Sequence, residues 1–586
     1  MKDFIIGLLL AGLIATPLAH ASQTDQTFKA IHTAEWAWRN GQPQPDGKPS
    51  PPPDNGRLDT VDAKSQHQRL AYWQQVMKKL DALDVDKLSP ANQVNYAIYH
   101  RQIAVRIADQ QFKQWQMPFN SDSSFWAGIG YQLGGGNLRS VADYQRYIDR
   151  LNQIPRYFDQ QIANMRLGLK RGFSVPRAVL DGRDKSIAMV ADITDPTASS
   201  FYRPFLHMPS TIPADQAAEL KAAAIESIRD DVIPAYAKLL KFFDNVYVPN
   251  ARKTLAAEAL PNGKAYYRQQ IKKYTTLDLT PQQIHRIGLQ QVAKIHAQML
   301  DVMKQAGFKG DFAAFVTYLR TDPKFYARTP QELLDKTAWV AKQVDGQMAK
   351  FFGHLPRQRF TIVPVPAAIA PYYTSGRGGA DEYLVNTYDL KARALFNMPA
   401  LTLHESYPGH SLQLELARER HGQPAFRRSG YISAYGEGWG LYSEFLGNEM
   451  GIYDTPYKKF GYLDYQMWRA CRLVIDTGIH AMGWSRQQAI DYLTEHTALS
   501  HLEIVNEIDR YISWPGQADS YELGYLTIRR LRARAEKALG GKFDIRAFHD
   551  TVLSTGSVPL PVLEKRIDQF IAEGGPEPDY ACDCRR

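Results

Sequence analysis

Apolar residues recur at intervals of three and four along most of this chain, a pattern that predicts a protein built mainly from α-helices. Pro, Gly, Ser, Thr or Asp bounds many of these segments, as expected at helix ends. We find no internal repeat. The expected helices lie near residues 62–82, 91–113, 141–170, 213–243, 281–305, 330–352, 462–482 and 486–498.

Two short segments depart from the helical pattern. Residues 359–366 and 381–388 are rich in β-branched and aromatic residues, which is typical of strands. The glycine-containing stretch 375–379 separates them and predicts a turn or loop. We therefore expect a small β-sheet next to the helix predicted around residues 401–412.

The first 21 residues have the features of a secretory signal peptide. Lys2 precedes an apolar run over residues 4–18, and Ala-His-Ala at 19–21 resembles a cleavage signal. We expect cleavage near Ala21 and a periplasmic or secreted protein. We expect no stable membrane anchor, because no cysteine follows the cleavage site and no other apolar run approaches the roughly 20 residues of a membrane span.

Length predicts more than one folding unit for the rest of the chain. We divide it near residue 250, into an N-terminal helical lobe over residues 22–250 and a second lobe over 251–586 that carries the small sheet. The Pro-rich stretch 41–56 is expected to form an extended loop. The expected fold is thus a large, two-lobed, mainly α structure.

Composition excludes several classes of protein. Three cysteines in 586 residues exclude a disulfide framework. One is Cys471, and Cys582 and Cys584 fall in a tail that we expect to be disordered. The formal net charge of +9 is spread along the chain, so we expect no nucleic acid partner and at most weak attraction to acidic surfaces or peptides.

The densest candidate chemistry is the segment His404-Glu405-Ser-Tyr-Pro-Gly-His410. Neutral imidazoles bind zinc, and a carboxylate beside the first ligand can move protons between water and a leaving amine. On a regular helix six residues would leave the two rings roughly 120° apart. Pro408 and Gly409 supply a break that would let both rings face one metal. The alternative is two histidines of a buried helix held by hydrogen bonds.

A third ligand is expected from the segment that begins at Tyr431. Glu437 and Glu444 are seven residues apart and share one helix face. We assign Glu437 as the metal ligand and Glu444 as the partner of a ligating histidine. The alternatives are two solvated acids, or His421 as a rival ligand. Close approach of another group is expected at Gly436, Gly438 and Gly440.

A further motif places Arg472, Asp476 and His480 at i, i+4 and i+8. This spacing predicts that Arg472 pairs with Asp476 along a helix. It also predicts that Asp476 orients the ring of His480, which could then act in catalysis. The alternative is a buried ion pair and a histidine of the core.

These motifs, together with Pro515-Gly-Gln517-Ala-Asp-Ser-Tyr521, make the chain resemble domain-of-unknown-function family 885 over nearly its whole mature length. That family looks similar to gluzincin-type zinc peptidases of the angiotensin-converting-enzyme and thermostable carboxypeptidase kind. The resemblance implies a helical metallopeptidase-like fold that holds Zn²⁺ through two histidines and a glutamate. The residues it implies are His404, His410 and Glu437 as ligands and Glu405 as general base.

The same resemblance suggests how substrate is bound. A histidine or tyrosine of such enzymes donates to the oxyanion, and His480 and Tyr521 are our candidates. An edge strand would hold an extended peptide. The remaining candidates for substrate binding are Tyr372, Tyr373, Asn386, Arg472 and Gln517.

The sequence hypothesis is an exported zinc metallopeptidase that hydrolyses short peptides, in the manner of a carboxypeptidase or dipeptidase. Two alternatives stay open. One is a peptide-binding protein of the same fold without turnover. The other is a zinc hydrolase of non-peptide amides.

Overall fold

The computed structural model describes residues 22–40, 56–134, 138–367, 369–420, 422–428 and 430–578. The expected signal peptide, nearly all of the Pro-rich stretch, His421, and the tail cysteines Cys582 and Cys584 lie outside these residues. Within them the fold is mainly α, as predicted.

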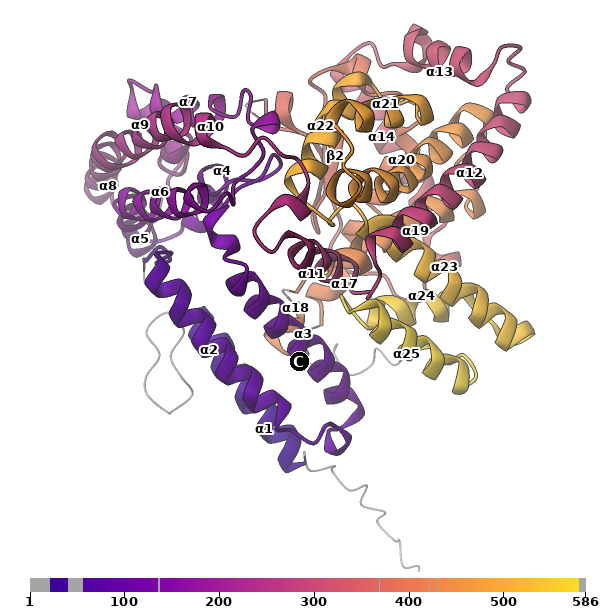
Figure 1. The fold of residues 1–586 in the computed structure, drawn as a ribbon, viewed down its shortest axis with the longest axis horizontal. Coiled ribbons are helices and arrows are strands. Elements are labelled where there is room, and N and C mark those ends of the chain that lie inside the picture. The colour runs from indigo at the N-terminus through magenta and orange to yellow at the C-terminus, as the bar shows by residue number, and fades with distance from the viewer. Residues whose placement is uncertain are drawn as a thin grey trace, which may run out of the picture.

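The helices before residue 251 fall into two sets. In Figure 1, α1–α3 extend downward as long rods, whereas α4–α10 gather at the left of the molecule. Their bounds are α1 (Gln23–Arg39), α2 (Ala63–Asp81), α3 (Pro90–Gln111), α4 (Phe125–Leu133), α5 (Val141–Leu151), α6 (Ile154–Lys170), α7 (Lys185–Ala191), α8 (Ala214–Ser227), α9 (Ile233–Phe242) and α10 (Val248–Asn250).

The remaining helices, except the central α11, lie mostly to the right in Figure 1. Their bounds are α11 (Gly263–Thr275), α12 (Pro281–Gln305), α13 (Phe312–Thr321), α14 (Pro330–Asp345), α15 (Met348–Phe351), α16 (Met398–Glu405), α17 (His410–Arg418), α18 (Ala425–Arg428), α19 (Ser433–Glu449), α20 (Pro456–Ala481), α21 (Arg486–His496), α22 (His501–Ser513), α23 (Ser520–Leu539), α24 (Ile545–Ser554) and α25 (Leu560–Ala572).

Every helix expected from periodicity forms, and some are interrupted. The helix expected over 281–305 matches α12 at both ends, where Thr280 forms a reciprocal capping box with Gln283. The segment 141–170 instead contains two helices, α5 and α6. The segment 213–243 passes through a π-helical turn at Ile228–Val232. Periodicity thus located the helices but not the breaks within them.

Two long helix pairs build the part of the fold that carries the candidate site. Helix α12 packs along α20, and α19 packs along α23. The second pair is unusually close where Gly438 meets Gly524, since a Cβ on Gly438 would lie 2.6 Å from the Cα of Gly524. Glycine at both positions therefore lets the two backbones touch.

The small sheet contains β1 (Thr361–Pro364), β2 (Gly376–Gly378) and β3 (Glu382–Val385), in the order β1-β3-β2. β1 runs parallel to β3, and β2 pairs antiparallel with β3. Both expected strands form. The glycine-containing stretch expected to be only a connection supplies the third strand, which lies at an edge beside α16.

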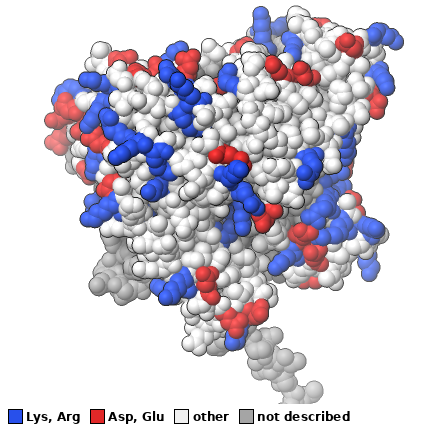
Figure 2. All heavy atoms as spheres, viewed as in Figure 1, with Lys and Arg blue, Asp and Glu red and all other residues white. Residues whose placement is uncertain are grey.

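One connected cluster of buried apolar side chains extends from Phe28 in α1 to Phe570 in α25. The division into lobes at residue 250 stays a prediction. Cys471 is buried with a free thiol. Lys and Arg are intermixed with Asp and Glu over the face in Figure 2. Among the helices that the structure describes, none combines the length and apolar character needed to span a membrane.

Candidate metal centre

The two histidines of the first motif lie on either side of a helix break. Helix α16 ends at Glu405 and α17 begins at His410, so residues 406–409 leave the helical path as predicted. Gly409 is required in the break, because a Cβ there would lie 1.9 Å from the carbonyl oxygen of His404. The break turns both imidazoles toward the same point.

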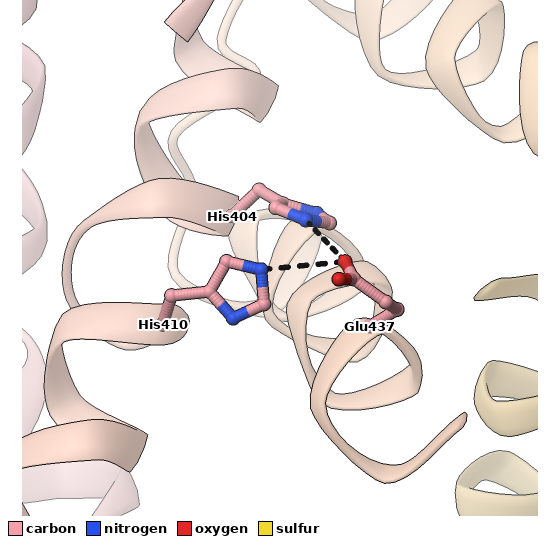
Figure 3. Close-up of side chains that lie close together, drawn as sticks. All are labelled: His404, His410 and Glu437. Carbon is pink, nitrogen blue, oxygen red and sulfur yellow. Dashed lines mark ion pairs between the residues drawn. The ribbon is translucent and has the colours of Figure 1, made fainter. Parts of the chain in front are cut away.

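Glu437 of α19 reaches that point from the opposite side (Figure 3). Its Oε2 lies 3.5 Å from Nε2 of His404 and 3.4 Å from Nε2 of His410. The three candidate ligand atoms all lie within 4.8 Å of one another. Tetrahedral zinc with bonds of about 2.0–2.1 Å would place neighbouring ligand atoms roughly 3.3 Å apart. The donor set and the two N···O distances therefore fit a zinc ion.

Glu444 contacts the His404 imidazole at Nδ1, the ring nitrogen that does not face Glu437. Its Oε1 lies 2.8 Å from Nδ1 of His404, and its side chain is fully buried. Gln466 donates to the other carboxylate oxygen at 3.4 Å. An Nδ1–H donated to Glu444 leaves the Nε2 lone pair free to face the metal position. The expected contact between Glu444 and a candidate ligand is confirmed.

The glycines of α19 allow the close approach expected of them. A Cβ on Gly440 would lie 2.5 Å from Cε1 of His404, and one on Gly436 would lie 2.4 Å from the ring of Tyr431. The His404 ring therefore lies directly on the backbone of α19.

We predict that Gly440→Ala lowers zinc affinity by roughly tenfold or more, because the added methyl group displaces the His404 ring from its position against Glu444. A matched control is Gly128→Ala in α4, where a Cβ would meet nothing within 4 Å. Competition of each variant with a chromophoric chelator measures the affinity. Equal affinity of the two variants would contradict the assigned position of the ring.

Tyr431 belongs to the site, although the sequence analysis did not predict it as a site residue. Its hydroxyl donates to Oε1 of Glu437 at 2.7 Å, so the carboxylate is held on the side away from the histidines. The feature of the sequence that could have indicated this contact is Gly436, because its lack of a side chain makes room for the Tyr431 ring.

Glu405, the expected general base, lies at the last residue of α16. Its Oε2 accepts a hydrogen bond from the backbone N–H of Gly378 in β2 at 2.6 Å. A Cβ on Gly378 would lie 1.9 Å from the carbonyl oxygen of Glu405, so only glycine lets the strand approach so closely. The edge strand therefore fixes the carboxylate beside the candidate ligands.

The site opens into a cavity of about 300 Å³. Besides Glu405, three of the expected substrate or catalytic residues line it: Tyr521, Arg472 and Gln517. The Tyr521 ring is nearly parallel to that of His404, with centroids 6.4 Å apart. A second cavity of about 840 Å³, lined partly by aromatic side chains, shares Asp122 with the first.

The contacts expected within the Arg472 motif are wrong. Arg472 donates to Glu507 at 2.8 Å rather than to Asp476. The Asp476 carboxylate instead accepts from the Tyr267 hydroxyl at 2.6 Å and from the Gly516 backbone at 3.1 Å. The spacing placed these residues on related faces, but other elements supply their partners.

His480 is also corrected, because it lies outside the lining of the metal cavity. Its Nδ1 accepts from the backbone N–H of Ala257 at 3.0 Å, and its Nε2 lies 2.9 Å from the carbonyl oxygen of Tyr511. Burial lowers the pKa of His480 to about 3, so the ring is neutral. Both nitrogens are used in joining three segments, which leaves neither for an oxyanion.

The expected peptide groove is revised in part. Asn386 is fully buried, and its amide donates to the backbone carbonyls of Ala370, Tyr373 and Thr374, so it shapes the loop before β2. Tyr373 lines the larger cavity rather than the metal cavity. The side chain of Tyr372 lies outside what the structure describes.

Charges in the cluster favour a protonated His404 when no metal is bound. Burial lowers the pKa of His404, but hydrogen bonds to Glu437 and Glu444 outweigh burial and raise it to about 9. Burial raises the pKa of Glu437, but the charge of His410 and hydrogen bonds to both imidazoles hold it well below its usual range. Without metal, His404 is thus protonated and contacts the carboxylates of Glu437 and Glu444, and a metal must displace that proton.

We predict that the metal-free protein loses stability as the pH rises from about 6.5 to about 9. In that window folded His404 keeps a proton that the unfolded chain, titrating near 6.5, has released, so the free energy of unfolding falls, on the order of 3 kcal/mol in total. Zinc-loaded protein lacks this loss because a ligating imidazole carries no such proton. Denaturant titrations of both forms at several pH values measure the difference, from which titrating groups outside the metal cluster cancel. An equal change of unfolding free energy with pH in the two forms would refute the prediction.

The fold is similar to that of solved bacterial proteins. A candidate lipoprotein from Colwellia psychrerythraea is 26% identical, with a TM-score of 0.85, over 94% of this chain and 100% of its own. A candidate lipoprotein of unknown function from Shewanella oneidensis is 18% identical, with a TM-score of 0.67, over 93% of this chain and 99% of its own. No curated protein matches the chain.

The family expected from the four motifs is confirmed, whereas the resemblance to gluzincins stays a prediction. The match extends over residues 35–567 and so includes all three candidate ligands. This chain therefore belongs to the family described as "Bacterial protein of unknown function (DUF885)".

Proposed function

We propose that this protein is a zinc-dependent metallopeptidase that hydrolyses short peptides as an exopeptidase. The observation that carries the proposal is the convergence of His404, His410 and Glu437 on one point, with the Glu405 carboxylate beside it in the same cavity. Two imidazoles and one carboxylate form the donor set of hydrolytic zinc sites that keep a position open.

Zinc would supply a Lewis acid that polarises the attacked carbonyl and activates water. His404, His410 and Glu437 would hold it, while Glu444 and Tyr431 orient the first and last of these ligands. The cluster contains two imidazoles and one carboxylate and no thiolate. Magnesium and calcium prefer sets made only of oxygen atoms, so this mixed set favours zinc over them.

Glu405 acts as general base and then as general acid in this proposal. Its carboxylate takes a proton from the attacking water and delivers it to the leaving amine. The Gly378 N–H fixes one of its oxygens and leaves the other for proton transfer. Of the two candidate donors to the oxyanion, Tyr521 lines the same cavity and is kept, whereas His480 is not. That role is worth roughly 2.7–4 kcal/mol in other hydrolases.

The volume of the cavity favours short peptides as substrates. Its volume of about 300 Å³ is at the lower end for small-molecule sites, and walls from α16, α19, α20, α22 and α23 surround it. Such a space accommodates a few residues rather than a folded chain. The neighbouring cavity of about 840 Å³ could accept the rest of a longer peptide.

Export completes the proposal. The N-terminal sequence resembles a signal peptide, and the structural neighbour from Colwellia psychrerythraea is described as a candidate lipoprotein. We propose that the mature protein acts outside the cytoplasm, on peptides in the periplasm or the medium.

The test is to purify the protein without added metal, measure bound zinc by mass spectrometry and incubate the protein with a mixed peptide pool. We expect one zinc per chain and progressive peptide trimming, both abolished by a chelator and restored by zinc. Zinc with peptide retention but no products would indicate a binding protein. Products from only non-peptide amides would indicate another hydrolase, and absence of zinc would overturn the proposal.

A further inference from the structure

Two arginines that line the metal cavity share a single acidic partner. Arg472 of α20 donates through Nη2 to Oε2 of Glu507 at 2.8 Å, and Nε of Arg510 in α22 lies 3.3 Å from the other oxygen of Glu507. Tyr511 donates its hydroxyl to the same carboxylate at 2.7 Å. Two cations against one anion leave a surplus positive charge at this wall.

The same arginines hold buried donors that no described residue satisfies. Nη1 of Arg472 and Nη2 of Arg510 have no hydrogen-bond partner among the described residues. The Arg472 side chain is only 3% exposed. An unpaired buried charged donor is costly in a folded protein. Two such donors, from different helices but on one cavity, are therefore suited to an anionic ligand.

The other arginines of the cavity each face a different acidic side chain. Arg377 pairs with Asp122 at 3.2 Å. Arg469 lies 3.5 Å from Glu444, although its Nε and Nη1 also have no hydrogen-bond partner among the described residues. Glu437 is itself a candidate metal ligand. The pair formed by Arg472 and Arg510 is thus the part of the lining with excess positive charge.

The distance from this pair to the metal position matches a short piece of peptide. The Arg472 guanidinium lies 4.0 Å from the centre of the Tyr521 ring, which lies 6.4 Å from the centre of the His404 ring. The guanidinium is therefore at most roughly 10 Å from the imidazole. A hydrogen bond of about 2.9 Å to the guanidinium takes up part of this distance. The remaining span of about 7 Å or less corresponds to one or two residues at about 3.3–3.6 Å each.

We propose that Arg472 and Arg510 bind the free α-carboxylate of the substrate, which makes the enzyme a carboxy-terminal exopeptidase that releases one or two residues. Planar guanidinium groups match a carboxylate in shape and charge. Stacking of Arg472 on Tyr521 links the carboxylate site to the candidate oxyanion donor. This assignment rests on the proposed peptidase function and adds the end of the peptide at which it acts.

The first test uses wild-type zinc-loaded protein and one neutral tetrapeptide in free, N-acetylated and C-amidated forms. We expect the first two to lose one or two C-terminal residues at similar rates. Amidation should lower kcat/KM by roughly 10- to 150-fold, the range for loss of charged hydrogen bonds. Equal cleavage of the amide, or loss of cleavage on N-acetylation, would overturn the proposal.

A side-chain carboxylate is the other source of the same chemistry. A C-amidated tetrapeptide ending in Glu distinguishes the two, since it carries a carboxylate but no α-carboxylate. We expect it to be as poor a substrate as the neutral amide. Cleavage at the rate of the free peptide would mean that the arginines recognise an acidic side chain, against the proposal.

The second test is Arg510→Gln, because Arg510 is less buried than Arg472 and its loss leaves the ion pair between Arg472 and Glu507 in place. The rate ratio of free to amidated peptide should fall toward one, mainly through KM. The matched control is Arg486→Gln, which removes an arginine paired with Asp509 outside the cavity and should keep the wild-type ratio. An unchanged ratio in Arg510→Gln would contradict the assignment.

Calorimetry separates failure of this inference from failure of the peptidase proposal. If no peptide is cut, zinc-loaded protein can still be titrated with an N-acetyl dipeptide and with its amide. Tighter binding of the free acid, lost in Arg510→Gln, supports the carboxylate site without turnover. Equal binding of acid and amide, or binding of neither, overturns it.

Discussion

Glu405→Gln is expected to lower kcat/KM for peptide hydrolysis by about 10²- to 10⁴-fold, the usual contribution of a general acid–base group. Glutamine keeps an oxygen that can accept from the Gly378 N–H, so the edge strand stays against α16. The amide cannot take a proton from water. The loss should therefore appear in kcat with little change in KM.

Zinc content and stability distinguish lost chemistry from lost structure in this variant. Glu405→Gln should retain one zinc per chain and the unfolding midpoint of the wild type. Glu415→Gln in α17 is the matched control, since Glu415 is buried but pairs with Arg418 outside the cavity and should tolerate the change with full activity. Undiminished hydrolysis by zinc-loaded Glu405→Gln would remove Glu405 from the mechanism.

His410→Ala is expected to abolish stoichiometric zinc binding and, with it, all hydrolysis. Only His404 and Glu437 would remain as ligands, fewer than the three that hydrolytic zinc sites use. Zinc bound to the folded state stabilises it, so a chelator should lower the unfolding midpoint of the wild type. The same chelator should leave the midpoint of His410→Ala unchanged, because that variant has no metal to lose.

The control for His410→Ala is a histidine outside the cluster. His285 in α12 lies 2.9 Å from the Thr477 hydroxyl and does not line the metal cavity, so His285→Ala should keep its zinc and its response to the chelator. Zinc retention by His410→Ala at wild-type affinity would mean that the ion, if present, is held elsewhere.

The local chemistry of the site could be predicted because it depends on short-range sequence. Pro408 and Gly409 break a helix wherever they occur in one, and the break is what aligns His404 with His410. A seven-residue spacing places Glu437 and Glu444 on one face of any helix. Both acids then contact His404, one at each ring nitrogen.

The contacts of the Arg472 motif could not be predicted in the same way. Helical spacing states which residues share a face, but not what packs against that face. Tyr267 of α11 and Gly516 form hydrogen bonds with Asp476. Ala257 and Tyr511 form hydrogen bonds with His480. Each partner comes from a segment distant in sequence, and a hydrogen bond to that segment replaces a weak pairing along one helix.

The residues that the sequence did not reveal are those whose role depends on folding geometry. Tyr431 reaches Glu437 only because the chain enters α19 from a loop that brings its hydroxyl back over Gly436. Arg510 joins Arg472 only because α22 packs against α20. No spacing rule links such positions.

By itself, the sequence determined the mainly α architecture, the strands predicted within residues 359–366 and 381–388, and the helix break that aligns His404 with His410. These features depend on periodicity, β-branched composition and helix breaking, which act within a few residues. The packing of α19 against α16, which brings Glu437 to the two histidines, is tertiary. The tertiary structure alone decided that a glycine segment becomes the edge strand holding Glu405, that His480 joins segments of the core, and that two arginines share one glutamate at the cavity wall. These outcomes depend on which distant surfaces meet, because a buried donor or charge takes the partner that packing brings within reach.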